Sequence, residues 1–161
     1  MILSTHAVVG GAIASLLPSH PAVAVVAAFA SHFAIDAIPH WDYRLGSIAV
    51  GKNADNRRLQ LNRGLLVDLM KICVDACAGL ALALWLFASA APIWIVALCA
   101  VAAMLPDPLQ FVHSVFPHEP LNTLQRFHGW IHSKRKLAWK EGVTSQIAFA
   151  FVVTALAIAL N

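Results

Sequence analysis

The chain has 161 residues, of which 60% are hydrophobic and only 12% are charged. A soluble domain carries about 25% charged residues, so this composition indicates an integral membrane protein. The formal net charge of +3 is too small to indicate binding to nucleic acid. A chain of this length builds one hydrophobic core, and we predict a single membrane-embedded domain over residues 1–161.

Five apolar segments follow one another along the chain and predict an all-α membrane bundle. They cover residues 5–17, 21–38, 65–88, 92–105 and 143–160. A full span needs ~20 residues, so the second, third and fifth segments are long enough to cross, while the first and fourth are short. Gly10 and Gly11 in the first segment allow a neighbouring helix to approach closely.

The basic residues lie almost entirely in two of the four connections. These residues are Arg44, Lys52, Arg57, Arg58 and Arg63 between segments two and three, and Arg126, Lys134, Arg135, Lys136 and Lys140 between segments four and five. Five crossings place both connections on the side of the N-terminus, which the positive-inside rule makes cytoplasmic. We therefore predict a multi-pass protein of the cell (inner) membrane with a cytoplasmic N-terminus.

The long connection before the fifth segment contains its own apolar pattern. Apolar residues recur there at helical spacing, with tryptophans and a basic run beside them: Leu121, Leu124, Phe127, His128, Ile131 and Ala138, flanked by Trp130, Trp139 and Lys134–Lys136. This pattern predicts an amphipathic helix that lies at the membrane interface.

Histidine and aspartate residues gather at the predicted cytoplasmic ends of the segments. His32 and Asp36 are four residues apart on one helical face, and His40 follows where the chain turns. His128 and His132 repeat the four-residue spacing, which lets two imidazoles reach one ion. Ionisable groups are costly within a membrane, so they indicate function or mutual pairing.

These five residues, together with His6 and Asp107, are the predicted metal ligands. A mixed shell of imidazole and carboxylate suits Zn²⁺ best, with Mn²⁺ or Fe²⁺ as alternatives, and the ligands suffice for one or two ions. Gly129 stands after His128, where zinc proteases have Glu, so the zincin class is excluded.

Asp68 and Asp75 open the third segment and are the predicted catalytic residues. A divalent ion lowers the pKa of its bound water toward ~7, and either carboxylate can orient that water or take its proton. The spacing of Asp68, Lys71 and Asp75 equally fits a structural ion triad along one helix face, so both interpretations stand.

Four short motifs contain the predicted ligands. They are Thr5-His6-Ala7-Val8-Val9-Gly10, Ser31-His32-Phe33-Ala34-Ile35-Asp36, Leu105-Pro106-Asp107 and His128-Gly129-Trp130-Ile131-His132-Ser133. They resemble the T-H-x-x-x-G, S-H-x-x-x-D, L-P-D and H-x-x-x-H-S motifs of the YdjM-like family of bacterial membrane-bound metal-dependent hydrolases. The second motif precedes the last two here, whereas it follows the others in that family. The resemblance implies a membrane metal site and metal-dependent hydrolysis.

We therefore predict a membrane-bound metal-dependent hydrolase that acts at the cytoplasmic face. A site at headgroup depth favours an amphiphilic lipid substrate, such as a phospholipid or a polyprenyl phosphate. The alternatives are non-enzymatic: a membrane metal-binding protein, an ion transporter or a structural helical bundle. An ion pathway needs polar residues across the whole bilayer, whereas the outer halves of these segments are almost purely apolar.

Overall fold

The computed structural model describes residues 1–46 and 63–161, and within these ranges the chain forms seven α-helices and no strand. The helices are α1 (Leu3–Leu16), α2 (Pro21–Asp36), α3 (Arg63–Phe87), α4 (Ile93–Met104), α5 (Pro106–Val115), α6 (Leu121–Ile131) and α7 (Trp139–Leu160). The predicted all-α class is confirmed. Lys52, Arg57 and Arg58, on which the topology prediction partly rests, lie outside the described residues.

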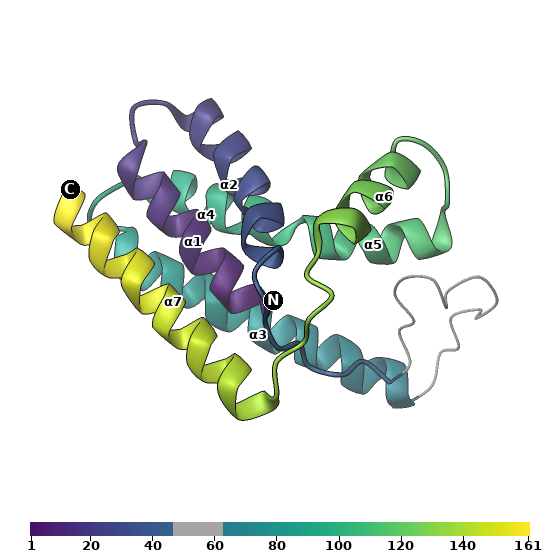
Figure 1. Cartoon of the computed structure of the whole chain (residues 1–161). Helices are drawn as coiled ribbons and strands as arrows, with labels where there is room; N and C mark the ends of the chain where they lie inside the picture. Colours follow the sequence, from purple (N-terminus) through teal and green to yellow (C-terminus); the bar gives the residue numbers. More distant parts are fainter. Residues whose placement is uncertain (47–62) are drawn as a thin grey trace.

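Helix α1 lies at the centre of a bundle and contacts α2, α3, α4 and α7 (Figure 1). Small residues allow these close approaches, as predicted. A Cβ atom at Gly10 would collide with the backbone carbonyl of Cys99 in α4. One at Gly11 would lie 2.8 Å from the ring of Phe87 in α3. The helix that carries His6 is therefore held firmly against its neighbours.

Two helices, α3 with 25 residues and α7 with 22, are long and apolar enough to cross a membrane. Helices α4 and α5 are bent by 48° and can form a third, broken span. The structure thus supports two or three of the five predicted crossings by length and composition. Helix α2 ends at Asp36 and has 16 residues, fewer than the ~20 that a full span needs. The orientation in the membrane stays a prediction.

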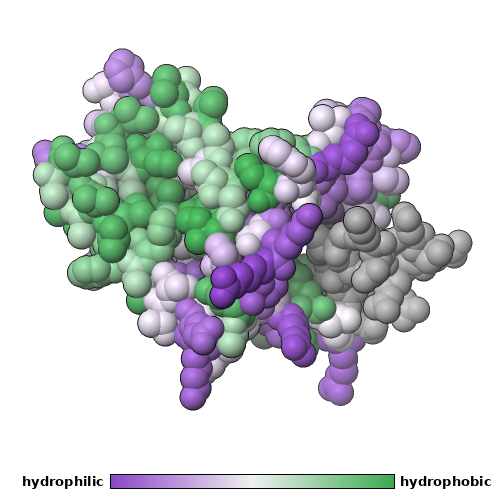
Figure 2. Space-filling view, in the orientation of Figure 1, coloured by the Kyte–Doolittle hydropathy of each residue, from purple (hydrophilic) through white to green (hydrophobic). Residues whose placement is uncertain are grey.

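Apolar side chains cover the outer surface of the bundle as well as its core. Trp85 on α3 is 80% exposed and Phe151 on α7 is 73% exposed. Figure 2 shows hydrophobic residues over the part of the bundle that holds the C-terminus, and hydrophilic residues toward α6 and the start of α7. Exposed apolar surface on long helices is typical of contact with lipid tails rather than water.

Helices α5 and α6 form a pair beside the bundle (Figure 1). Helix α6 confirms the predicted helix in this connection, although Ala138 of the predicted stripe lies outside it, directly before α7. Helix α5 was not predicted, because Pro106 was interpreted as the end of the fourth segment. Pro106 and Pro108 instead occupy the first turn of α5, where proline needs no amide hydrogen and its fixed φ favours a helix.

Candidate metal centre

Imidazole side chains from several elements converge on the carboxylate of Asp36, which is fully buried at the end of α2. The Nε2 atoms of His32, His128 and His132 lie 3.3, 3.2 and 3.5 Å from Asp36 Oδ2. Those of His6 and His40 lie 3.3 and 3.9 Å from Asp36 Oδ1. Five rings from α1, α2, α6 and the segments after α2 and α6 therefore surround one carboxylate.

The chain on either side of Asp36 is fixed by backbone contacts that bring His132 to the cluster. Helical spacing places His32 and Asp36 one turn apart on α2. The amide of Ser133 donates to the Asp36 carbonyl at 2.8 Å, and the amide of Leu137 donates to the His40 carbonyl at 3.0 Å. The segment after α6 thus runs beside the segment after α2. It brings His132 next to Asp36, although the two residues are 96 positions apart in the chain.

Two further carboxylates border the cluster. Asp107 Oδ1, at the start of α5, lies 3.5 Å from His32 Nε2. Asp42 Oδ1 lies 3.3 Å from His40 Nε2, and Asp42 Oδ2 pairs with the Lys136 ammonium. The amino nitrogen of Met1 lies 2.7 Å from Asp36 Oδ1 and 3.0 Å from Asp42 Oδ1.

The electrostatic surroundings set the charge states of two groups in the loops. Burial raises the pKa of Asp42, but the hydrogen bond with His40 and the nearby cationic groups outweigh burial and hold that pKa far below its usual range. Burial lowers the pKa of His132, which keeps its imidazole neutral at pH 7. A neutral imidazole beside an ionised carboxylate is the form that binds a divalent ion.

Three of the five rings direct their Nδ1 atoms at backbone carbonyls. The distances are 2.8 Å from His32 to Ala103, 2.6 Å from His40 to Ile38 and 3.2 Å from His132 to Ser133. A carbonyl oxygen only accepts, so each Nδ1 carries a proton, and when the ring is neutral its Nε2 directs a lone pair toward Asp36. Histidines that bind metals are held in this way, with the second ring nitrogen donating to a carbonyl or carboxylate.

Buried ring nitrogens that face a carboxylate are stabilised by a proton or a cation between them. Within the described residues, His32 Nε2 and both ring nitrogens of His6 are buried without a hydrogen-bond partner. Such orphaned polar atoms are rare in folded proteins, because each costs free energy that only a proton, a water or a metal ion recovers. The donor set therefore fits a divalent metal ion.

The ligand atoms fall into two groups that share Asp36. One contains His32, Asp36, Asp107 and His128, and the other contains Asp36, His40 and His132; within each group the ligand atoms lie within 4.8 Å of one another. Six of the seven predicted ligands are thus brought together, and His6 adjoins Asp36. The prediction of a buried His and Asp cluster is confirmed, and its metal-binding role stays a proposal.

The predicted catalytic residues belong to neither group. Asp75 accepts hydrogen bonds from the backbone amides of Leu3 at 2.7 Å and Ser4 at 3.2 Å, so it caps the first turn of α1. Asp68 is 2% exposed, and its Oδ1 atom lies 3.3 Å from the Lys71 ammonium. This contact is one of the two ion pairs of the predicted triad. The role of Asp68 and Asp75 in proton transfer stays a prediction.

No protein-family model matches the chain, and neither does any curated protein or solved structure. The site is therefore defined by residue spacing and by the geometry of the described residues. The resemblance to the YdjM-like family stays a proposal.

A cavity of about 450 Å³ opens beside the cluster. Its apolar lining comes from Met1, Leu3, Leu45, Leu69, Ile72, Pro108 and Phe111, and its polar lining from Asp42, Tyr43, Asp107, Gln110 and His132. Small-molecule sites have volumes of about 300–1,000 Å³ and combine apolar walls with a few polar groups. Each candidate ligand group contributes one residue to this cavity, Asp107 or His132.

Sequence reasoning missed Gln110 and the local role of Lys136. Gln110 lies three residues after Asp107 and contacts both Asp107 and His128, a relation that becomes visible only if α5 is recognised as a helix. Lys136 was assigned to membrane topology alone, yet its ammonium contacts Asp42 and lies 3.4 Å from His40 Nε2. Sequence spacing gives no sign of that contact.

Proposed function

We propose that this chain is a membrane-bound metal-dependent hydrolase with its metal centre around Asp36. The observation that carries the proposal is a set of three histidines whose Nδ1 atoms are held by backbone carbonyls and whose Nε2 atoms face the buried carboxylate of Asp36. His32, Asp36, Asp107 and His128 would hold an ion, and Asp36, His40 and His132 would hold a second. Zn²⁺ best fits this shell, with Mn²⁺ or Fe²⁺ as alternatives. The motif resemblance to YdjM-like hydrolases points to the same chemistry.

An ion held there supplies a bound water whose pKa is lowered toward ~7. The residues of the chain orient this chemistry toward the adjacent cavity, because Asp107 and His132 belong to both the cluster and the cavity lining. Burial raises the pKa of Tyr43, so its hydroxyl stays protonated and offers a hydrogen-bond donor in the same cavity.

The proposed substrate is an amphiphile with a hydrolysable ester near its headgroup, such as a phospholipid or a polyprenyl phosphate. Leu69 and Ile72 of α3, a helix long and apolar enough to cross a membrane, line the cavity. The apolar chain of the substrate can therefore pack against α3. The polar lining lies within reach of the ester. We propose that this chemistry takes place at the cytoplasmic face, to which the basic connections assign the cluster.

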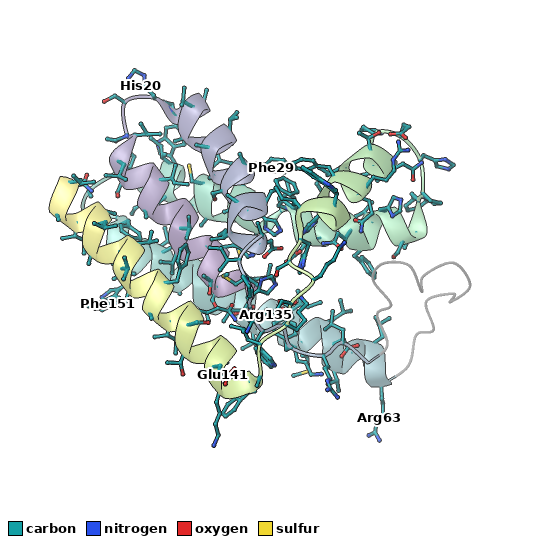
Figure 3. All side chains as sticks on the ribbon, viewed as in Figure 1. His20, Phe29, Arg63, Arg135, Glu141 and Phe151 are labelled. Atoms are coloured by element: carbon teal, nitrogen blue, oxygen red, sulfur yellow. The ribbon has the colours of Figure 1, made fainter. Side chains whose placement is uncertain are left out.

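A non-enzymatic, metal-stabilised bundle is the second candidate. It is favoured by the full burial of His6, His32 and Asp36, because groups that join helices need no access to substrate. Transport is less well supported. His20 lies at the α1–α2 turn, away from Arg135 and Glu141, and the core between these ends is apolar (Figure 3).

An Asp36→Asn substitution separates these functions. We expect wild-type protein to hydrolyse members of a panel of phosphoester and carboxylester lipids with added Zn²⁺ or Mn²⁺, and a chelator to stop turnover. Asp36→Asn should lose bound metal and turnover while the apolar bundle still melts cooperatively. Glu141→Gln, an exposed change on α7, is the matched control. No turnover by wild type, with a large fall in Tm for Asp36→Asn, would favour the structural bundle.

A further inference from the structure

The histidines around Asp36 differ in what holds the second ring nitrogen. His32, His40 and His132 direct Nδ1 at backbone carbonyls. His128 instead has its Nδ1 atom 2.8 Å from the side-chain amide nitrogen of Gln110. A backbone carbonyl only accepts, whereas a glutamine amide offers a donor at one end and an acceptor at the other. Rotation of one neighbouring side chain can therefore change the tautomer of His128.

The present orientation of Gln110 favours one of the two tautomers. Its Nε2 lies 2.8 Å from His128 Nδ1 and 3.3 Å from His128 Nε2, so the shorter contact is donated to Nδ1. The same Nε2 lies 3.2 Å from Asp107 Oδ1, while Oε1 accepts from Gln125 at 3.3 Å. With Nδ1 accepting, His128 carries its proton on Nε2 and donates it to Asp36 Oδ2 at 3.2 Å. In this tautomer Nε2 has no lone pair for an ion.

We propose that Gln110 is a positioning residue that selects the tautomer of His128. In the orientation described above, the Gln110 amide favours the tautomer in which His128 donates a hydrogen bond to Asp36, and no metal is bound. After a half-turn of the amide, Oε1 accepts the proton of Nδ1, and His128 presents a bare Nε2 to the ion. This inference rests on the metal centre of the proposed function, but not on hydrolysis.

The surrounding contacts allow both orientations. Gln125 is itself an amide, so its contact with Gln110 survives when donor and acceptor are exchanged. Asp107 loses the Gln110 donor on rotation, but an ion held by the group that contains Asp107 and Asp36 would replace that donor with a stronger partner. Gln110 also lines the cavity, so loading of the metal changes which end of its amide faces a bound molecule.

Metal affinity of the purified full chain, measured by competition with a chelator, tests this role. Gln110→Met keeps the length of the side chain but removes its hydrogen bonds to His128, Asp107 and Gln125, and we expect Zn²⁺ to bind about 10–100-fold more weakly. Gln110→Glu presents only acceptors when ionised and should retain the affinity. Gln125→Met, which removes a contact to Gln110 but none to His128, is the matched control and should cause a smaller loss. The Tm of the metal-free proteins reports any purely structural effect.

The tautomer is measured directly by ¹⁵N–¹H correlation of histidine-labelled protein. We expect the His128 proton on Nε2 without metal and on Nδ1 with Zn²⁺ in the wild type, and on Nδ1 in both states of Gln110→Glu. An ion that binds without moving this proton would overturn the inference and leave the metal centre intact. A wild type that binds no divalent ion would overturn both. If Gln110→Met does not fold, the wild-type spectra decide.

Discussion

The two oxygens of Asp36 face different surroundings, although they belong to one carboxylate. On the Oδ2 side, the Nε2 atoms of His32, His128 and His132 lie 3.2–3.5 Å from Asp36, His32 also contacts Asp107, and no Lys or Arg of the described residues pairs with either carboxylate. On the Oδ1 side, the neighbouring carboxylate of Asp42 is paired with the Lys136 ammonium. Negative charge is thus compensated on the Oδ1 side by the Lys136 ammonium and by the Met1 amino group, which lies 2.7 Å from Asp36 Oδ1, whereas on the Oδ2 side it is left to imidazoles.

This difference indicates where an ion gains most free energy. Asp107, which has no Lys or Arg partner among the described residues, gains a cation when an ion binds, whereas a carboxylate already paired with an ammonium, such as Asp42, gains less. We therefore expect the group of His32, Asp36, Asp107 and His128 to bind an ion more tightly than the group of Asp36, His40 and His132.

The sharpest test of this comparison removes one imidazole from each side. We expect His32→Ala to weaken Zn²⁺ binding by about 100-fold or more, and His40→Ala to weaken the tightest binding event by less than about 10-fold. Isothermal titration of purified protein measures both. His118→Ala, an exposed histidine in the loop after α5, is the control. Equal losses for the two variants would break the comparison.

A second test lowers the pH. The pKa of His132 is already lowered by burial, so this ring is neutral at pH 7, and protons compete with an ion only once the pH falls below the pKa of each ligand. Stability supplied by the metal is therefore present at neutral pH and lost on acidification. We expect affinity to fall by about 10-fold per pH unit for each imidazole that must release a proton. An affinity that stays constant from about pH 7.5 down to the pH at which the protein unfolds would exclude imidazole ligands.

The smallest effect is expected at Lys136. The ammonium is 48% exposed and its partner Asp42 is 36% exposed, so Lys136→Met should change the free energy of unfolding by only about 0–1 kcal/mol. Metal affinity on the Oδ1 side should rise, because Asp42 loses its compensating charge. Chemical denaturation and metal titration measure the two effects. Weaker metal binding in this variant would show that Lys136 supports the site instead of competing with the ion.

Residue spacing predicted most of the cluster because its pairs obey helical geometry. His32 and Asp36 lie one turn apart on α2, and His128 and His132 lie at and just beyond the end of α6. His6 joins them through the glycine-mediated packing of α1, of which Gly10 was the sequence sign. The apolar segments likewise predicted the helices of the bundle, whose periodicity and length are local properties.

Long-range contacts account for what the sequence did not predict. Asp75 was interpreted as a candidate for proton transfer, but it contacts the first turn of α1, where its partner Leu3 lies 72 positions before it in the chain. Helix α5 was missed because a proline can either end a helix or begin one, and the neighbouring structure decides. The position of Gln110 one turn after Asp107 follows only if α5 is a helix, so the role of Gln110 was not predicted either.

The chain order of the cluster has a consequence for biosynthesis. Asp36 is made 92 residues before His128, so the first two helices leave the ribosome carrying a carboxylate and two imidazoles whose other partners do not yet exist. Burying such groups alone in a bilayer is expensive. We therefore expect the final packing of α1 and α2 to follow the synthesis of α6 and to precede that of α7.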